Sequence, residues 1–455
     1  MTIPNNILIQ VQTYQRAKLG YLNNLNCMLG ELTNKKFKNF PGIQYNLGSS
    51  VTFDLPPFMT GNNGLVAIFG PANQRLATLT CDQAFVVPYA FTAQNKIFNV
   101  DKDVDSYMEE FGKSAAETLG AKVESNVALN AASACPVMTI NNQGQSVPTG
   151  ALHTESGPTR FFGNGVSPIN SYQQLAQGIE NFKEIGSTRS WKVVLPNTVI
   201  PAIIGSGLNQ FAPRRNDEIA NSWELGEFGT PPVRYYVSNL LPSHVAGFVG
   251  DAAAPNNVFT VVSTNDPTGL NITQITATEP TGSTAAAAVR AGDLFQFNDG
   301  VSGQPNLRTL TSIGNYMTSQ PVQFRAIADA ASVAGSVVIN LVAGQNAQNG
   351  GGLQSQTVNG TQNINYNIVA GMKFTPLPSH KCAFMLNGDA FYLAMPQLPD
   401  QAPFPTGNEV DPETGASIRM TQGATFGGNQ YGTTLDATWG SLLLPSYSQR
   451  YAFPL

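Results

Sequence analysis

The longest regular pattern of apolar positions lies between Asp101 and Ser133 and predicts an α-helix. Apolar residues recur there at steps of three and four, which gives the helix one apolar face. That face consists of Val104, Tyr107, Met108, Phe111, Ala115, Leu119, Val123 and Val127. Pro136 prevents continuation beyond the end. Gly112 and Gly120 each cost about 1 kcal/mol inside a helix, so packing against other elements must hold it.

The length of this helix favours a role as a spine. At 1.5 Å per residue it spans roughly 45 Å, which is longer than a small domain is wide. The sequence around it has the pattern of strands and turns rather than of further long helices. We therefore expect sheets and loops to pack along it. The alternative at this point is an ordinary core helix in an α+β enzyme.

The residues before the spine helix predict an arm and an extended hairpin. An apolar stripe from Asn5 to about Lys38 indicates a helix that ends before Pro41. Alternating apolar positions around Phe53 and again around Val87 predict two strands, separated by a passage rich in Gly, Pro and Asn. A two-stranded hairpin is marginally stable alone, so this one needs a surface to lie on.

After the spine helix the pattern alternates between helix and strand. A helix is predicted from Ser171 to Gly186, with Ser171 as its N-cap. Strands are predicted at Trp191–Leu195 and Val233–Ser238, and a further helix from Asn197 to Phe211. This alternation indicates a compact α/β unit.

Helical periodicity disappears between about Gly250 and Asn367. Short β-like pieces alternate there with turn-rich sequence, which predicts a self-contained β-barrel or sandwich. The glycine-rich segment from Gly344 to Gln362 is expected to be an exposed, flexible loop. Beyond Gly371 the earlier pattern resumes, so we expect a β-module inserted into a discontinuous host domain.

Composition narrows the class of protein. Charged residues make up 12% of the 455 residues, about half of the usual share, while 42% are hydrophobic. Low charge suits a surface that is mostly covered by copies of the same chain, and it also suits an extracellular adhesin. The net charge of −5 argues against a basic groove for nucleic acid. No uninterrupted apolar stretch of about 20 residues and no secretory signal are visible.

One local cluster of positive charge lies in the first 42 residues, where Glu31 is the single acid. Its members are Arg16, Lys18, Lys35, Lys36 and Lys38. The cluster predicts either a solvated helix face or a contact with an acidic partner.

No group of residues predicts catalysis. Cys27, Cys81, Cys135 and Cys382 are dispersed and are expected to be free thiols. They and the three histidines lack the spacing of metal ligands. His244 and His380 are expected to stabilise turns beside prolines, and Asp436 to form a local hydrogen bond at a strand end. The sequence therefore predicts no enzyme, no cofactor and no metal site.

Four passages resemble the major capsid proteins of short-tailed bacteriophages, the lineage whose coat protein carries an inserted β-barrel domain. Pro232–Gly247 is similar to that family's strand followed by SN-x-LP-x-H-x-x-G, and Ala291–Phe295 to its AGD-x-F strand. Phe384–Pro399 resembles the segment that follows the insertion. Ser417–Gly423 and Leu435–Gly440 resemble the closing strands, IR and then LD-x-x-WG. The order and spacing of these passages carry the resemblance.

The resemblance implies an α+β protein with the Johnson fold of tailed-phage and herpesvirus shells. It divides the chain into an N-terminal arm (1–42), an extended loop (43–98), the spine helix of a peripheral domain (99–135), an axial domain (136–248), an inserted β-barrel domain (249–370) and a return to the host domains with C-terminal strands (371–455). The function implied is that of a coat protein assembling in the host cytoplasm into pentamers and hexamers of an icosahedral head around double-stranded DNA.

The partners implied are a scaffolding protein, a portal and further copies of the chain, with no membrane. The basic cluster of the arm is then expected to face the interior and to contact the scaffold. A glycan-binding phage-tail or adhesin module is the alternative. It would account for the β-rich middle of the chain and leave the spine helix and the basic arm unexplained.

Overall fold

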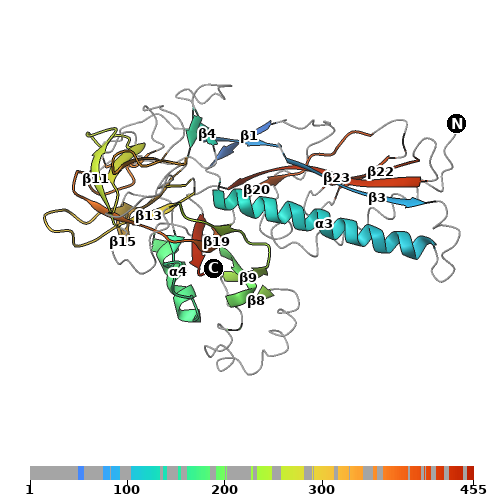
Figure 1. The fold of residues 1–455 in the computed structure, drawn as a ribbon, viewed down its shortest axis with the longest axis horizontal. Helices are drawn as coiled ribbons and strands as arrows, with labels where there is room; N and C mark the ends of the chain where they lie inside the picture. Colours follow the sequence, from blue (N-terminus) through green and yellow to red (C-terminus); the bar gives the residue numbers. More distant parts are fainter. Residues whose placement is uncertain are drawn as a thin grey trace, which may run out of the picture. The chain divides into compact units, whose positions relative to one another are not determined.

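The computed structural model resolves the chain into two compact units, which are described one at a time (Figure 1). Among its described residues, no helix is both long enough and apolar enough to cross a membrane. The described residues are 50–55, 75–81, 83–92, 104–133, 137–140, 152–154, 161–184, 191–199, 201, 227–228, 233–247, 258–280, 289–290, 292–311, 316–326, 328–341, 352–355, 362–387, 390–400, 404, 406–410, 417–424, 430–443 and 448–455.

The first unit consists of a long helix and a five-stranded sheet. Helix α3 (Val104–Ser133) is the predicted spine helix, and Figure 1 shows it running along the strands of the sheet. The strand order is β20-β23-β22-β21, and β3 pairs with β23. The strands are β3 (Gln83–Thr92), β20 (Phe391–Ala394), β21 (Thr406–Val410), β22 (Ser417–Ala424) and β23 (Gln430–Leu443).

The predicted apolar face of α3 is buried along its central and later turns. Leu119, Val123 and Val127 have no exposed surface, and both internal glycines are buried on the same side. Phe111 was expected on this face, but it keeps 39% of its surface exposed. Periodicity identifies the side of a helix that packs, and it does not show how far along the helix that packing extends.

Strand β3 presents alternate residues to the two sides of the sheet. On one side, the Phe85 ring lies 5.8 Å from the Lys122 ammonium of α3. On the same side, the Trp439 indole N–H donates to Asn126 Oδ1 of α3 at 3.2 Å. This side of the sheet is therefore the one that packs on α3.

The second unit contains a mixed seven-stranded sheet, called the host sheet below. Its order is β6-β24-β19-β7-β9-β8, with β10 paired to β19. The pairs β24–β6 and β7–β9 are parallel. The strands are β6 (Phe161–Phe162), β7 (Trp191–Pro196), β8 (Glu227–Phe228), β9 (Val233–Ser238), β10 (Ser243–His244), β19 (His380–Asn387) and β24 (Ser448–Phe453).

Helix α4 (Tyr172–Glu184) packs on strand β24 of the host sheet. Its predicted N-cap is confirmed, because Gln174 donates its backbone N–H to Ser171 Oγ at 3.3 Å. Gly178 allows a close approach: a Cβ there would lie 2.6 Å from Tyr451 Cε1. The helix predicted from Asn197 to Phe211 begins as a short 3-10 turn, Asn197–Val199 (η3), and residues 202–211 lie outside the described residues.

A separate sheet lies between β10 and β19 in sequence. Because β10 pairs with β19, with Ser243 opposite Lys381, the chain leaves and re-enters the host sheet at neighbouring strands. The strand order between them is β16-β13-β18-β11-β12-β17, with β14–β15 as a separate pair. The strands are β11 (Phe259–Thr264), β12 (Gln274–Thr278), β13 (Leu294–Phe297), β14 (Arg308–Leu310), β15 (Met317–Pro321), β16 (Gln323–Arg325), β17 (Ser336–Asn340) and β18 (Lys373–Pro376).

We call residues 258–377 the inserted domain. Strand β18 lies between β11 and β13, so this sheet extends past residue 370, where the sequence analysis places the end of the insertion. Among the described strands, the order ends at β16 on one side and β17 on the other. Closure into a barrel stays a prediction.

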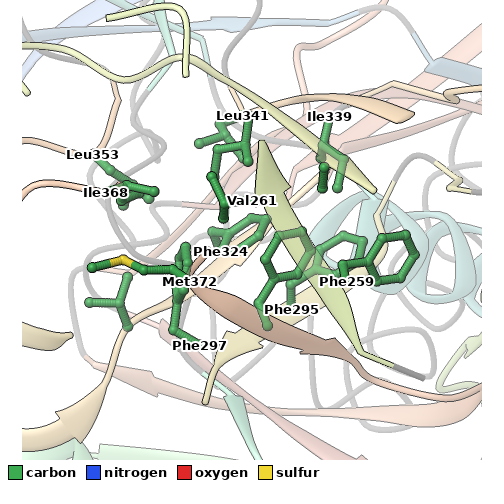
Figure 2. Close-up of a cluster of buried hydrophobic side chains, with 14 of the residues drawn as sticks. Phe259, Val261, Phe295, Phe297, Phe324, Ile339, Leu341, Leu353, Ile368 and Met372 are labelled. Atoms are coloured by element: carbon green, nitrogen blue, oxygen red, sulfur yellow. The ribbon is translucent and has the colours of Figure 1, made fainter. Parts of the chain in front are cut away.

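The inserted domain has its own hydrophobic core, part of which is drawn in Figure 2. Five phenylalanine rings contact one another within it, with neighbouring centroids 5.0 Å apart for Phe295 and Phe324 and 5.3 Å apart for Phe259 and Phe374. All residues of this cluster fall between Phe259 and Phe374. This cluster is therefore built from side chains of the inserted domain alone.

The expectation of an exposed loop from Gly344 to Gln362 is wrong for residues 352–355. Leu353 is 1% exposed, and its backbone exchanges two hydrogen bonds of 2.9 Å with Ile272. Gly352 donates to Asn271 Oδ1 at 2.9 Å, and a Cβ on it would lie 2.2 Å from the Ile272 carbonyl oxygen. Buried Leu353 and the side-chain amide of Asn271 therefore contribute to holding residues 352–355 in place.

A smaller sheet in the second unit has the order β1-β2-β4-β5. It contains strands on both sides of the spine helix in sequence, since β1 and β2 precede α3 while β4 and β5 follow it. These strands are β1 (Ser50–Leu55), β2 (Arg75–Thr80), β4 (Val137–Ile140) and β5 (Leu152–Thr154). The two strands predicted on either side of the Gly/Pro/Asn-rich passage are present as β1 and β3, but they lie in different sheets and so do not pair with each other as the predicted hairpin.

Candidate functional site

Two buried carboxylates, one in each unit, bring together passages that are far apart in the sequence. Asp293 of the inserted domain meets His244 at the end of the host segment that leads into the insertion. Asp436 of β23 meets Arg419 of β22. The Asp293 pair joins two of the passages on which the resemblance to capsid proteins rests, and the Asp436 pair joins the two strands of the fourth passage.

The Asp293 carboxylate accepts hydrogen bonds on both oxygens. Oδ1 lies 2.7 Å from His244 Nε2, so this ring nitrogen carries the proton of the pair. Oδ2 accepts the backbone N–H of Arg290 at 2.7 Å and that of Gly247 at 3.1 Å. The side chain of Asp293 is 3% exposed. Several donors on a buried carboxylate offset the cost of removing its charge from water.

A second histidine extends this cluster into the host sheet. His380 is fully buried, and its ring centroid lies 5.5 Å from that of His244. Its Nδ1 lies 2.8 Å from the Pro378 carbonyl oxygen and so donates to it, which leaves Nε2 as an acceptor facing Arg450 Nη1 at 3.5 Å. Burial first, and then the Arg450 charge, lower the pKa of His380 to about 3. His380 is therefore neutral at ordinary pH.

Cys382 lies next to this cluster on strand β19. It is a fully buried free thiol, and burial raises its pKa. A protonated, inaccessible thiol does not act as a nucleophile. Its backbone N–H donates to the Pro242 carbonyl oxygen at 2.9 Å, which ties β19 to the segment that leads into the insertion.

The Asp436 cluster lies within one sheet. Both Asp436 oxygens accept hydrogen bonds from Arg419, with the Arg419 Nε to Asp436 Oδ1 distance at 3.2 Å. Arg419 Nη1 also donates to the Pro399 carbonyl oxygen at 2.6 Å. The two residues are register partners on β22 and β23, so their side chains project from the same face.

These arrangements hold segments together and leave little room for chemistry. Both carboxylates are buried and already accept several hydrogen bonds, so neither is placed to take a proton from a substrate. Among the described residues, no three His, Cys, Asp or Glu side chains gather as metal ligands would. The geometry suits a structural role for both clusters.

The predictions made from the sequence for individual residues are partly confirmed. His380 does stabilise a turn beside a proline, as expected, through Pro378. His244 instead bonds Asp293, and Asp436 lies within β23, paired with Arg419, rather than at a strand end. The basic cluster of the arm and the thiols of Cys27 and Cys135 lie outside the described residues, while Cys81 is a buried free thiol as predicted.

Sequence reasoning missed both acid pairs. One signal could have indicated them. All four residues lie in passages that resemble the same family: His244 and Asp293 form one pair, and Arg419 and Asp436 form the other. Residues that recur in one family's motifs are candidates to touch, even when 49 residues separate them, as they do His244 and Asp293.

No family model and no curated protein matches the chain. Solved structures are similar to it over most of its length. The capsid of Ralstonia phage GP4 is 7% identical, with a TM-score of 0.43, over 94% of this chain and 91% of that one. The capsid asymmetric unit of cyanophage Pam1 is 11% identical, with a TM-score of 0.40, over 92% and 87%.

A structure from Mycobacterium phage Che8 is 8% identical, with a TM-score of 0.40, over 92% of this chain and 89% of that one. Two of these three structures are described as capsids.

Proposed function

We propose that this chain is a major capsid protein that assembles into the closed icosahedral head of a bacteriophage. In this proposal copies of the chain form pentamers and hexamers, with a scaffolding protein, a portal and packaged DNA as partners. The work of such a protein is geometric: many modest contacts between copies add up to a stable shell.

The observation that carries the proposal is the pairing of the resembling passages. His244 of the SN-x-LP-x-H-x-x-G passage contacts Asp293 of the AGD-x-F passage. Arg419 of the IR strand contacts Asp436 of the LD-x-x-WG strand. His244 and Asp293 are 49 residues apart, so passages that resembled one family by chance would have no reason to meet there as buried, hydrogen-bonded partners. Their meeting supports a common architecture with that family.

The exposed side of β3 adds support from physical chemistry. The four residues that point away from α3 are uncharged and exposed: Ala84, Val86, Pro88 and Ala90, with Val86 50% exposed. A row of exposed apolar side chains on a strand is unfavourable in an isolated molecule. Contact with another copy of the chain would remove this row from water, as a shell requires.

The test is sedimentation velocity with electron microscopy of the peak fractions, on the protein made together with the genes that neighbour its own. We expect closed shells of uniform size. A monomer or small oligomer that never forms shells, with a scaffolding protein present, would contradict the proposal. That outcome would favour the glycan-binding module, which glycan-array binding would then identify.

The basic arm gives a second test of the same proposal. We propose that Arg16, Lys18, Lys35, Lys36 and Lys38 face the shell interior and contact the scaffold. Reversing all five charges should reduce the yield of shells without lowering the melting temperature of the unassembled chain, because charge attraction acts mainly on association. As a control, reversal of the exposed Lys373 of the inserted domain should leave the yield unchanged. Normal shells from the five-residue variant would exclude this role.

A further inference from the structure

The inserted domain is attached to the host sheet by more than its two chain crossings. A domain inserted through two crossings is free to move unless its interface with the host is well packed. Three separate contacts lie between the inserted domain and the host sheet. Together they bear on whether the two parts move independently.

The first contact is the Asp293 carboxylate. Asp293 and Arg290 belong to the inserted domain, while His244 and Gly247 belong to the host segment that precedes it. The carboxylate accepts from all three of these neighbours at 2.7–3.1 Å. Because its oxygens are shared between the two parts, the domain cannot turn on the host segment without breaking buried hydrogen bonds.

The second contact is steric. Gly247 lies against the loop that contains Arg290, and a Cβ at position 247 would stand 2.5 Å from the Arg290 backbone nitrogen. The two backbones are therefore as close as any sequence allows, and glycine is the residue that permits it.

The third contact is made by β6, which is separated from β19 by β24 in the host sheet. The Gln323 side-chain oxygen of the inserted domain accepts the Phe161 backbone N–H at 2.7 Å. Beside it, Phe161 and Ala452 of the host pack with Leu294 and Leu377 of the inserted domain as a buried apolar cluster. Two ties attached to different host strands oppose rotation better than one.

From these contacts we infer that Asp293 is a latch that makes the inserted domain and the host sheet one rigid body. In this arrangement the orientation of the inserted domain is set within each chain, before any contact with another copy. Asp293 acts as a positioning residue, because it orients a whole domain through His244 and Gly247.

The test measures one distance across the junction by pulsed electron spin resonance. Spin labels are attached at Ser302→Cys in the inserted domain and Val166→Cys in the host. Both positions are exposed, and the loop of Val166 is held by Asn164 Oδ1, which accepts the Val166 and Ser167 N–H groups at 3.0 and 2.7 Å. Cys27 and Cys135 are changed to Ser, and the buried Cys81 and Cys382 stay in place. The labelled full-length chain is diluted into unlabelled chain, so that distances within one chain are measured.

We expect a single narrow distance distribution in the otherwise unchanged protein and a distribution about twofold wider in Asp293→Ala, because the domain then samples several orientations. Asp293→Asn keeps the size of the side chain and should give an intermediate width. The control is Asp299→Asn, which removes a half-exposed carboxylate paired with Arg308 in the same domain and should leave the width unchanged.

Near-ultraviolet circular dichroism of each variant checks that the phenylalanine core stays intact, and Asp293→Asn alone decides the result if Asp293→Ala fails to fold. A distribution that is already broad in the unchanged protein would overturn the latch. The latch would also be overturned if the variants at position 293 stay folded and their distance distributions are as narrow as that of the Asp299→Asn control. The first result would leave the inserted domain as a freely moving module, and the second would assign its fixed orientation to contacts other than Asp293.

Discussion

The two buried acids, Asp436 and Asp293, differ in what their partners connect. Asp436 faces a permanently charged guanidinium on the next strand of the same sheet. Asp293 faces a histidine and two backbone N–H groups, and these belong to two different parts of the fold. The first pair therefore stabilises a layer, whereas the second fixes one domain on another. Both carboxylates are buried and hydrogen-bonded, and what differs is whether their partners lie in the same sheet or in two parts of the fold.

The largest effect is expected from removing a strand of the inserted domain. Residues 250–377 should fold alone, because the core lies between Phe259 and Phe374. Residues 250–367 should not fold, because they lack β18, which pairs with both β11 and β13. Dispersed amide resonances from the longer fragment and a collapsed spectrum from the shorter one would confirm this. Equal spectra would show that β18 is dispensable.

The next effect concerns the ion pair of the first unit. Asp436→Ala leaves the Arg419 charge buried without its partner and should cost about 3–5 kcal/mol of unfolding free energy. The double variant Arg419→Met/Asp436→Leu removes both charges and should cost less than either single change. Urea denaturation of the unassembled chain measures both. A double variant as unstable as the single one would mean that the pair matters for more than charge balance.

Trp439 tests the packing of the same sheet on α3. It is 1% exposed, so Trp439→Ala should cost about 3–5 kcal/mol through the cavity it leaves. Trp439→Phe keeps an aromatic ring but loses the donor to Asn126, and should cost about 1–2 kcal/mol. Thermal melts of the two variants separate the contribution of volume from that of the hydrogen bond. Equal losses would assign the whole effect to the hydrogen bond.

The effect that is smallest near neutral pH is a pH dependence carried by the second unit. The pKa of His380 is about 3 in the folded chain and near 6.5 in the unfolded one, so unfolding takes up a proton between these values. Stability should therefore fall as pH drops from 6.5 towards 3, by at most about 1.4 kcal/mol per pH unit from this residue. His380→Gln should flatten the slope of unfolding free energy against pH. A slope that is unchanged in the variant would contradict the assignment.

Periodicity and capping predicted those elements that depend on neighbours in sequence. The spine helix, the helix capped by Ser171, and the strands at Trp191 and Val233 are all present. Their signals are local, since each arises from side chains a few residues apart. The insertion was also visible, because the change from helical to strand-like patterning persists for more than a hundred residues.

Contacts between distant segments could not be predicted in the same way. The Arg419–Asp436 pair depends on the register of β22 on β23, and the Asp293–His244 pair on where the inserted domain turns back to its host. Leu353 was missed because its Gly, Asn and Gln neighbours resemble an exposed loop, although one leucine reaches the core. Which strands pair and how a domain docks on its host depend on the whole fold, and the periodicity of a single segment does not show them.

Cryo-electron microscopy of the assembled particles would test the proposal of a shell protein most directly. We expect a closed icosahedral shell in which every copy of the chain retains both the Arg419–Asp436 and the His244–Asp293 contacts. Particles with no icosahedral order would contradict the proposed function. An icosahedral shell in which the His244–Asp293 contact is broken in some copies would keep that function and contradict the latch.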